Sequence, residues 1–580
     1  MPKGIGVKTT IGATVPGGTS IVYRTGDWRE FRPTLISRIA PCREACPAGV
    51  NIQDFLWESR YEQFEQAWRI LTEENPFPSI CGRVCGHPCE GACNRKDFDA
   101  PLSIHAVERF IGDYGLERGL AARIPVPDLK KKIAVVGSGP AGLSCAYHLR
   151  RLGYRVTVFE RTSRCGGMLR WGIPEYRLPQ VILDNEIEKL QKMDIQIEME
   201  SSVPEDFLRE GLREYAAIFL ALGSQKDLNM GIPGEQLPGV FHGLEFLRRI
   251  KEGKTFTVGR QVAIAGGGNT ALDVARTAIR LGSIPVLLYR RSREEMPALP
   301  EEVEEALKEG VRIEFLVSPI SIHGMERKRL RIECLRNRLG EPGVDGRKSP
   351  VPIAGSNFSI EVDAVLSAFG ETVASEDFLQ PLARNEARIS VNDWQATSMP
   401  GVFAGGDAAL SEKTVAHAIG AGKKAALSID AYIQRRSFDR LQPLLLGTSK
   451  SPSMAYRLCS PPEGHRIDQV VRFDDLNLYG SEHLPREQMP QRPAEQGRTR
   501  SFDEVNLGFD QEMVLREARR CFRCGSCSFC ENCYVFCPDG AVIRKMKERI
   551  IDINYDFCKG CGICANECSS HFIDIVPEGK

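Results

Sequence analysis

Sixteen of the 20 cysteines in this 580-residue chain lie in two short stretches, six between Cys42 and Cys93 and ten between Cys521 and Cys568. A disulfide framework of this density is typical of small secreted domains. This chain is long, and its first 20 residues lack the apolar core of a signal peptide. Thiolates at such close spacing favour metal–sulfur sites instead. We therefore expect a cytoplasmic protein that carries iron–sulfur clusters.

The C-terminal cysteines repeat one spacing. Cys527-x2-Cys530-x2-Cys533-x3-Cys537-Pro is followed by a second run from Cys558 to Cys568 with the same intervals, although Ser569 replaces the proline. In two-cluster ferredoxins three close cysteines hold one cluster and the fourth reaches the other. A pair of zinc sites is the alternative. The spacing assigns one [4Fe–4S] centre to Cys527, Cys530, Cys533 and Cys568, and the other to Cys537, Cys558, Cys561 and Cys564.

The length, charge and patterning of the chain indicate several α/β domains. Lys plus Arg and Asp plus Glu number 76 each, which does not favour nucleic-acid binding, and no apolar run is long enough to cross a membrane. Two strand–glycine–helix–strand patterns predict two Rossmann-like domains. The predicted parts are an N-terminal α-helical Fe–S domain (1–125), a FAD-binding domain (126–235 plus 375–437), an NAD(P)H-binding domain (236–374), a linker (438–515) and a C-terminal α+β ferredoxin-like domain (516–580).

The first glycine motif is Gly137-Ser-Gly139-Pro-Ala-Gly142, which follows an apolar strand and opens a helix. The first glycine permits a tight turn, the second lets a pyrophosphate approach the backbone, and the third allows close packing of helix on strand. The helix N-terminus then favours the phosphates. Glu160 ends the next strand, where an acid can bind ribose hydroxyls. This predicts a dinucleotide site.

The second motif is Gly266-Gly-Gly268-Asn-Thr-Ala271, and Arg290 and Arg291 rather than an acid end the following strand. An acid there would bind a free 2′-hydroxyl, whereas arginine pairs with a 2′-phosphate. NADPH is therefore favoured, and NADH stays possible if the arginines are only a solvated strand end. The residues predicted for NAD(P)H are Gly266, Gly268, Asn269, Thr270, Arg290 and Arg291.

Residues 165–179 (CGGMLRWGIPEYRLP) and 400–407 (PGVFAGGD) resemble the flavin-contacting segments of the disulfide-reductase-like flavoproteins with two dinucleotide domains. The resemblance implies that Asp407 binds the ribityl–phosphate part of FAD and that a helix starting near Thr414 points at the flavin ring. Cys165 has no CxxxxC partner, which argues against disulfide reduction, and His417 and Glu412 are interpreted as structural. We nominate no catalytic acid, base or nucleophile, because the cofactors carry hydride transfer. The residues expected at FAD are Gly137, Gly139, Ala141, Gly142, Glu160, Arg161, Gly167, Met168, Arg177, Gly223, Gly406, Asp407, Thr414 and Val415.

The segments PCREACPAGVNIQ and NPFPSICGRVCGHPCEGACNR, followed by IHAVERFIGD, resemble the N-terminal domain of the glutamate synthase small-subunit family over about residues 40–435. That family holds two [4Fe–4S] clusters in this domain. The resemblance implies one centre at Cys46, Cys85, Cys89 and Glu108. It implies a second at Cys42, Cys93 and a CxxC pair just upstream of Cys42.

The upstream pair is absent, since residues 35–40 read LISRIA. Cys521-Phe-Arg-Cys524 is a CxxC that the ferredoxin pattern does not need, and its sequence resembles the missing segment. One hypothesis is that this pair folds back to complete the centre with Cys42 and Cys93. The alternatives are that Cys81 is the ligand, or that Cys521 and Cys524 are spare thiols.

The parts together predict an NAD(P)H:acceptor oxidoreductase that exchanges hydride with FAD and passes single electrons through clusters to a partner redox enzyme. The architecture is similar to the iron–sulfur flavoprotein of dissimilatory sulfite reductase systems and to NAD(P)H-linked subunits of 2-oxoacid:ferredoxin oxidoreductases, which makes those enzymes the expected partners. A glutamate synthase small subunit and an electron-bifurcating transhydrogenase subunit are alternatives. A non-enzymatic scaffold is disfavoured by the intact glycine motifs, and a homodimer stays possible.

Overall fold

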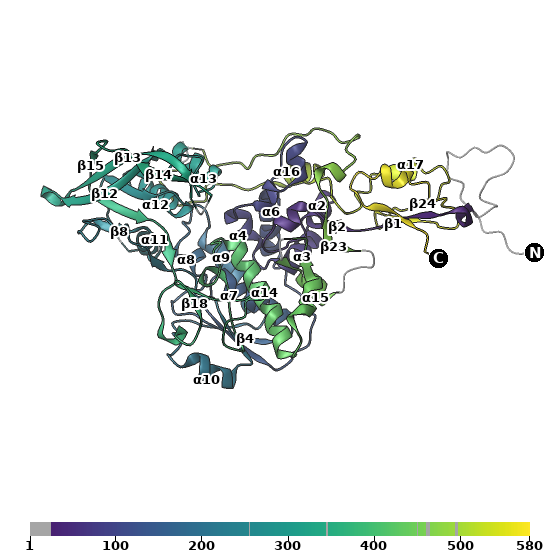
Figure 1. Cartoon of the computed structure of the whole chain (residues 1–580), viewed down its shortest axis with the longest axis horizontal. Coiled ribbons are helices and arrows are strands. Elements are labelled where there is room, and N and C mark those ends of the chain that lie inside the picture. Colours follow the sequence, from purple (N-terminus) through teal and green to yellow (C-terminus); the bar gives the residue numbers. More distant parts are fainter. Residues whose placement is uncertain are drawn as a thin grey trace, which may run out of the picture.

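The computed structural model describes residues 25–254, 256–343, 346–448, 451–459, 465–493 and 497–579. Figure 1 shows an elongated molecule with the second nucleotide-binding sheet at one end and the C-terminal cysteine-rich segment at the other. The N-terminal helices lie between them, above the first nucleotide-binding sheet. Among the described helices none is long and apolar enough to cross a membrane.

The first Rossmann-like unit is a five-stranded parallel sheet in the order β20-β6-β3-β4-β5. Its central strand β3 (Lys132–Val136) is the run KIAVV, buried at every position but the first, as expected of a parallel strand covered on both faces. Helix α14 (Val415–Ile433) lies against α7 (Pro140–Arg151) on this sheet. The other strands are β4 (Arg155–Phe159), β5 (Gln196–Glu198), β6 (Ala217–Leu220) and β20 (Val402–Ala404), and its further helices are α8 (Met168–Trp171), α9 (Gln180–Gln191) and α10 (Phe207–Glu214).

The second Rossmann-like unit is a parallel sheet in the order β11-β10-β9-β16-β8. Its strands are β8 (Val240–His242), β9 (Gln261–Gly266), β10 (Ile284–Tyr289), β11 (Arg312–Phe315) and β16 (Ala364–Ala368), and its helices are α11 (Gly243–Lys251), α12 (Asn269–Arg280) and α13 (Pro300–Lys308). An antiparallel sheet interrupts it before β16. That sheet comprises β12 (Val317–Gly324), β13 (Leu330–Pro342), β14 (Lys348–Pro352) and β15 (Phe358–Val362).

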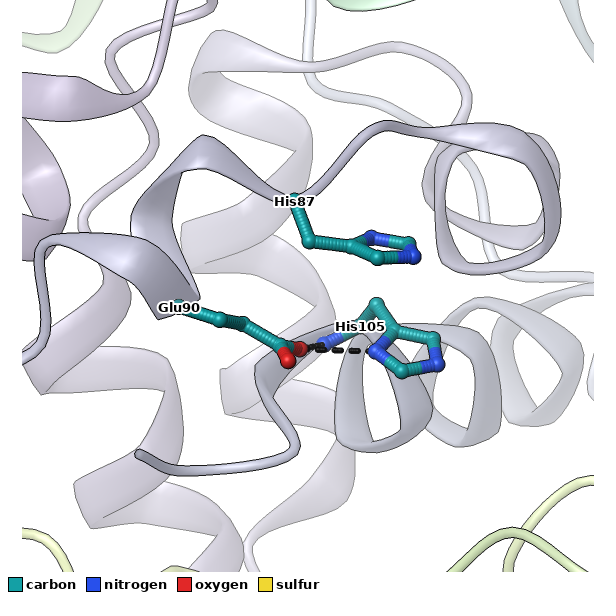
Figure 2. Close-up of side chains that lie close together, drawn as sticks. All are labelled: His87, Glu90 and His105. Atoms are coloured by element: carbon teal, nitrogen blue, oxygen red, sulfur yellow. Dashed lines mark hydrogen bonds and ion pairs between the residues drawn. The ribbon is translucent and has the colours of Figure 1, made fainter. Parts of the chain in front are cut away.

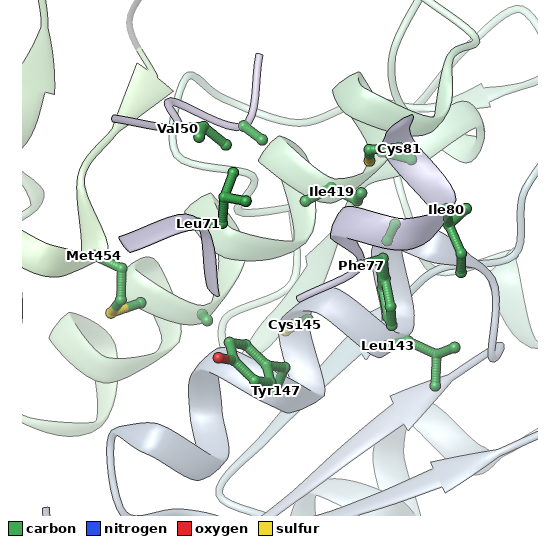
Figure 3. Packing of buried hydrophobic residues seen from close by; sticks show 14 of the residues in the cluster. Val50, Leu71, Phe77, Ile80, Cys81, Leu143, Cys145, Tyr147, Ile419 and Met454 are labelled. Carbon is green, nitrogen blue, oxygen red and sulfur yellow. The ribbon is translucent and has the colours of Figure 1, made fainter. Parts of the chain in front are cut away.

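The N-terminal cysteines lie on short helices that share a core with the first Rossmann-like unit. Figure 3 shows Leu71, Phe77 and Ile80 of the N-terminal helices packed against Tyr147 of α7 and Ile419 of α14. Burying these side chains together fixes the cysteine-bearing helices over the nucleotide-binding sheet. The helices are α1 (Pro41–Ala45), α2 (Ile52–Arg60), α3 (Phe64–Glu74), α4 (Pro78–Val84), α5 (Pro88–Gly91) and α6 (Ile104–Glu117).

The C-terminal segment folds into a compact unit of α17 (Asn532–Val535), β24 (Val542–Lys545), β25 (Ile550–Ile553), α18 (Ile563–Asn566) and β26 (Ile573–Pro577). Strand β1 (Phe31–Leu35) pairs antiparallel with β26. The side chain of Arg29 also forms an ion pair with Glu578. Residues 25–36 therefore lie with the C-terminal unit rather than with the helices of the segment 1–125 to which the sequence assigned them.

The segment 438–515, expected as a surface linker, runs across the other units in a largely irregular path. Its strands and α-helix are β21 (Leu445–Leu446), β22 (Ser451–Pro452), α15 (Met454–Leu458) and β23 (Arg466–Val470). Helix α16 (Gln511–Arg519) begins inside this range and ends beyond it. Strand β23 pairs with β2 (Arg38–Ile39), just before α1. Figure 1 shows the chain then reaching α13 and returning to α16. The α/β class, with two Rossmann-like units, N-terminal helices and a C-terminal α+β unit, is confirmed.

Candidate functional site

The first glycine turn has the geometry of a phosphate-binding loop. Gly137 has φ +103°, and a Cβ there would lie 2.4 Å from the Ala221 carbonyl oxygen. A Cβ on Gly142 would lie 1.9 Å from the Gly137 carbonyl oxygen, whereas one on Gly139 would meet no described atom within 4 Å. The first and third glycines thus serve the turn and its packing. Gly139 faces open space at the start of α7, where an anion is favoured.

Two remote segments close on this turn. A Cβ on Gly167 would lie 2.8 Å from the Gly139 Cα, and one on Gly406 would lie 2.9 Å from the Ala141 Cβ. Next to Gly406, burial raises the pKa of Asp407, against the effect of nearby Lys413. The carboxylate of Glu160 accepts hydrogen bonds from Ser138 N at 3.1 Å and from Thr162 N at 2.8 Å. The Glu160 carboxylate therefore also stabilises the first glycine turn.

These segments surround a cavity of about 430 Å³. All the residues expected at FAD line it except Gly142, which is buried in the packing of α7 on the strand. Asn269 and Thr270, at the start of α12 in the second Rossmann-like unit, line the same cavity. The open face of Gly139 and the half-buried acid at Asp407 fit the phosphate and ribityl parts of a dinucleotide.

The cavity has a third wall that the sequence did not predict. Val84, at the end of α4, and Gly86, in the turn before α5, line it, and they flank Cys85. Leu244, Asp273, Glu371 and Lys413 are further lining residues that were missed. The contact of the Cys85 turn with the cavity depends on how α4 packs on the Rossmann-like unit. The CxxxC motif of Cys85 and Cys89 marks these residues as candidate metal ligands, but it does not reveal how α4 packs.

The second glycine turn is built in the same way. Gly266 has φ +152° and a Cβ there would lie 2.4 Å from the Ala368 carbonyl oxygen, while one on Gly267 would lie 2.2 Å from the Tyr289 ring. After Tyr289 the two arginines diverge. The side chain of Arg290 is exposed, whereas Arg291 is buried and donates from Nε to the Lys348 carbonyl oxygen at 2.8 Å. Gly266, Gly268, Arg290 and Arg291 lie outside the shared cavity.

The cysteines nearest the cavity gather with two acids, Glu90 and Glu108. Burial raises the pKa of Cys89, and the neighbouring Cys46, Glu90, Cys85 and Glu108 raise it further. Burial likewise raises the pKa of Glu108 to about 7, although Asn75 donates a hydrogen bond to its Oε1 at 2.8 Å. Such thiols lose their protons on binding a metal, so a buried set of this kind fits an iron–sulfur cluster. Cys81 lies with this group, since Glu108, Cys85 and Cys46 all raise the pKa of its thiol beyond the effect of burial.

Two histidines and an acid lie beside this group. Figure 2 shows the rings of His87 and His105 stacked, with centroids 3.9 Å apart, and Glu90 Oε1 2.7 Å from His105 Nδ1. Arg486 donates to the other Glu90 oxygen at 2.6 Å. Glu90, His105 and Arg486 therefore form a hydrogen-bonded network, and His87, in the loop between Cys85 and Cys89, contacts it by stacking on His105.

The C-terminal cysteines separate into two groups. Burial raises the pKa of Cys533, and Cys527, Cys530 and Cys568 raise it further, followed by a smaller effect of Cys564 from the other group. Cys537, Cys558, Cys561 and Cys564 instead border one small cavity. The structure thus brings together the two sets that the ferredoxin spacing assigns.

Cys42, Cys93, Cys521 and Cys524 form a further group between the N-terminal helices and the C-terminal unit. All 20 cysteines lie in the described residues and all are free thiols, so the structure contains no disulfide framework in that part of the chain.

Comparisons with known proteins agree with this geometry. Residues 131–425 match the pyridine nucleotide-disulphide oxidoreductase family. The chain belongs to that family. Residues 35–120 match the family described as dihydropyrimidine dehydrogenase domain II, 4Fe-4S cluster. The expectation that the chain binds FAD, NAD(P)H and [4Fe–4S] clusters is therefore confirmed.

Three relatives extend the similarity beyond the nucleotide-binding units. The NADP(+)-dependent formate dehydrogenase subunit beta of Moorella thermoacetica is 37% identical over 84% of this chain and 70% of its own length. The NADPH-Fe(3+) oxidoreductase subunit beta of Geobacter sulfurreducens is 34% identical over 84% of this chain and 75% of its own. The glutamate synthase [NADPH] small chain of Escherichia coli is 33% identical over 68% and 88%. The resemblance to the glutamate synthase small-subunit family is confirmed, and the protein is an NAD(P)H-dependent iron–sulfur flavoprotein oxidoreductase.

Proposed function

We propose that this protein connects the NAD(P)H pool to a partner redox enzyme, with its cysteine groups carrying single electrons between the flavin site and the C-terminal unit. The observation that carries the proposal is the shared cavity, whose walls come from the first Rossmann-like unit, the start of α12 and the residues that flank Cys85. A site for a flavin, a site for a nicotinamide and a site for a cluster thus adjoin. When bound, a flavin accepts two electrons as a hydride and returns them singly.

The chain's own residues bind and orient the reactants. The N-terminus of α7 and the glycines before it receive the pyrophosphate of FAD. The N-terminus of α14 also faces the cavity, where Thr414 caps the helix by accepting from His417 N at 3.2 Å. Asn269 and Thr270 bring the start of α12 to the same space, where a nicotinamide held by the second unit would meet the flavin.

The four cysteine groups follow one another away from the cavity. The group of Cys46, Cys85 and Cys89 adjoins the cavity wall, and Cys42 and Cys93 lie next along the same helices. Cys524 is separated from Cys527 of the C-terminal unit by two residues. Clusters in these positions would form a chain from the flavin to the molecular end shown in yellow in Figure 1.

The C-terminal unit is the surface we assign to the partner. The Cys530 and Cys561 side chains are exposed there, as are Val535, Phe536 and Met546. Exposed apolar side chains near a redox centre suit a transient electron-transfer contact. The partner is proposed to be a dissimilatory sulfite reductase or a 2-oxoacid:ferredoxin oxidoreductase. The two beta-subunit relatives match 84% of this chain, whereas the glutamate synthase small chain matches 68%. This difference favours a subunit of a heteromeric redox complex over a glutamate synthase small subunit.

The test separates flavin reduction from electron exit. In anoxic stopped-flow mixing, NADPH should bleach the flavin of the wild type and of Cys85→Ser alike, while Cys85→Ser should reduce a viologen dye at least about tenfold more slowly. Cys459→Ser, at an exposed thiol outside the four groups, is the control. If NAD(P)H fails to bleach the wild-type flavin, the proposal is wrong. Purified sulfite reductase and 2-oxoacid oxidoreductase, offered separately as acceptors, identify the partner.

A further inference from the structure

We propose that Cys521 and Cys524, carried by the C-terminal part of the chain, complete a four-thiolate [4Fe–4S] site with Cys42 and Cys93 of the N-terminal helices. This site deepens the proposed function, because it would stand between the group nearest the cavity and the ferredoxin-like unit. The family matched by residues 35–120 does not include the segment that supplies the two added thiols.

The four thiols converge although they come from distant parts of the sequence. Asn94, next to Cys93, lies with its Nδ2 atom 3.5 Å from Cys524 Sγ. Cys42, Cys93 and Cys524 lie in one buried core, and the partly buried Cys521 packs against that core. The side chains of Cys42, Cys93 and Cys524 are each less than 10% exposed. A buried site with four sulfur ligands at hand fits a cubane cluster.

The backbone at this position is fixed from both sides. Arg95 donates from Nη1 to the Arg520 carbonyl oxygen at 2.6 Å, directly before Cys521. Arg38 N donates to the Gly525 carbonyl oxygen at 2.8 Å, directly after Cys524. Gly525 has φ +76°, and a Cβ there would lie 2.6 Å from the Arg38 carbonyl oxygen. Only glycine permits this close approach, which holds the CxxC turn against the strand that leads to Cys42.

Side chains anchor the same turn. The Arg520 guanidinium, 1% exposed, donates to Ala100 O at 2.7 Å and to Glu517 Oε1 at 2.7 Å. Arg523 lies 4.0 Å above the Trp57 ring of α2. Spare thiols would not need a turn anchored to three separate elements. The competing ligand Cys81 belongs to the group of Glu108, Cys85 and Cys46.

The test compares metal content in four forms of the full-length protein purified without oxygen. Cys521→Ser/Cys524→Ser should contain about four iron and four sulfide ions per chain fewer than the wild type, the content of one [4Fe–4S] cluster. It should also lose one electron paramagnetic resonance signal of the dithionite-reduced protein. Cys42→Ser should lose the same ions and the same signal, and Cys459→Ser should lose none.

A combined Cys42→Ser/Cys521→Ser/Cys524→Ser variant decides whether the residues share one cluster. Shared ligation predicts a loss no greater than that of either parent variant, whereas separate sites predict additive losses. Unchanged iron in Cys521→Ser/Cys524→Ser or in Cys42→Ser, additive losses, or about one zinc in place of the iron would each overturn the proposal. Bleaching of the flavin by NADPH should persist in every variant, so a failure of this site is distinct from a failure of the proposed function.

Discussion

Arg177 Nη1 lies 2.7 Å from Asp273 Oδ2, and this ion pair joins the flavin-side segment to helix α12 on the wall of the shared cavity. Both side chains are less than 10% exposed, and Arg177 Nη2 is also 3.0 Å from Glu302 of α13. The pair fixes the second Rossmann-like unit in relation to the first. In the function proposed above, hydride transfer depends on that relation, because different units would hold the flavin and the nicotinamide.

Replacing Arg177 with Gln should therefore slow flavin reduction by NADPH at least about tenfold, since a misplacement of about 1 Å can cost about a hundredfold. Because Arg177 also lines the cavity expected to hold FAD, the rate is taken per bound flavin. The measurement is the rate of flavin bleaching in stopped-flow mixing at saturating NADPH. Arg213→Gln, which removes an exposed arginine paired with Glu210, is the matched control. A wild-type rate in Arg177→Gln would show that the ion pair does not set the orientation.

Arg290 is the arginine expected to select NADPH. Its side chain is exposed after β10 and has no partner among the described residues, whereas Arg291 is buried and donates to Lys348 O. A hydrogen bond to a charged group contributes about 1.5–3 kcal/mol, or roughly 10- to 100-fold in affinity. Arg290→Ala should raise the Kd of NADPH by that factor and leave the Kd of NADH unchanged.

Titration of flavin-loaded protein with each nucleotide checks this selection. Arg293→Ala is the control, because Arg293 lies in the same loop but pairs with Glu304. An equal weakening of NADPH and NADH in Arg290→Ala would contradict the assignment of the 2′-phosphate.

The two glycine turns were predictable because each is encoded locally. An apolar strand, a glycine turn and a helix follow one another within about 20 residues, and the structure has β3, Gly137 and α7 in that order. The difference between Arg290 and Arg291 was less visible. Neighbouring residues at a strand end point to opposite sides, and the packing of β14 decides which side is covered.

The parts that escaped prediction depend on contacts between distant segments. Strand β1 was assigned to the N-terminal helices because it directly precedes them in the sequence, whereas its pairing with β26 joins opposite ends of the chain. The cavity wall at Val84 and Gly86 likewise follows from the packing of whole units. The weak periodicity of residues 438–515 predicted a linker with little regular structure, and it gave no sign of the charged side chains that bind this segment to the second Rossmann-like unit.

Glu309 is the centre of that attachment. Its carboxylate, 0% exposed, accepts from Arg276 at 2.8 Å, Arg280 at 2.6 Å and Arg498 at 3.2 Å. Burial acts to raise the pKa of Glu309, but hydrogen bonds from Arg280 and Arg276 outweigh it and the pKa lies below its usual range. Glu309→Leu would leave three arginines without their shared partner, at a cost of about 3 kcal/mol or more.

The segment around Arg498 should then open about a hundredfold more often. Limited trypsin digestion of the native protein measures this as faster cleavage between residues 484 and 510. Glu304→Leu, at an exposed position of α13, the helix that ends just before Glu309, should leave the cleavage rate within about twofold of the wild type. If trypsin cleaved Glu309→Leu no faster than the wild type, contacts other than those of Glu309 would hold the segment.

Lys251 makes the free energy of unfolding depend on pH. Its Nζ atom is buried and has no hydrogen-bond partner in the described residues. Burial lowers the pKa of Lys251 from 10.5 to about 8, against the attraction of Glu175. Below pH 8 the folded protein carries a charge that burial disfavours, whereas between about pH 8 and 10.5 only the unfolded chain is protonated, so this contribution to stability rises with pH.

Lys251→Met should therefore stabilise the protein by about 1–3 kcal/mol at pH 7, because about 1.4 kcal/mol corresponds to each unit of pKa shift. The gain should shrink as the pH rises from 8 to 10. The midpoint of urea unfolding at several pH values measures it. Lys254→Met, at an exposed lysine paired with Glu252, is the control. A gain that did not vary with pH would show that methionine acts through packing alone.

Lys423 and Glu74 form an ion pair at the junction of α14, α3 and the loop after Cys46. Lys423 Nζ lies 2.6 Å from Glu74 Oε2, with side chains 0% and 1% exposed, and it also donates to the Ala48 carbonyl oxygen. The Glu74 carboxylate further accepts from Ser453 Oγ at 2.6 Å and from Met454 N at 2.9 Å. Burial favours the protonated acid, but Lys423 outweighs it and holds the pKa of Glu74 below its usual range.

Removing one partner should be costly. Lys423→Met leaves a buried carboxylate without its counter-charge and should destabilise the protein by about 3–5 kcal/mol. The same substitution at Lys192, whose pair with Glu188 is exposed, should cost less than about 1 kcal/mol. Urea unfolding followed by flavin fluorescence measures both. The double variant Lys423→Met/Glu74→Leu should recover part of the loss, because neither buried charge remains. If the double variant lost the sum of the two single effects, the pair would not be coupled and α14 would be held by its apolar face alone.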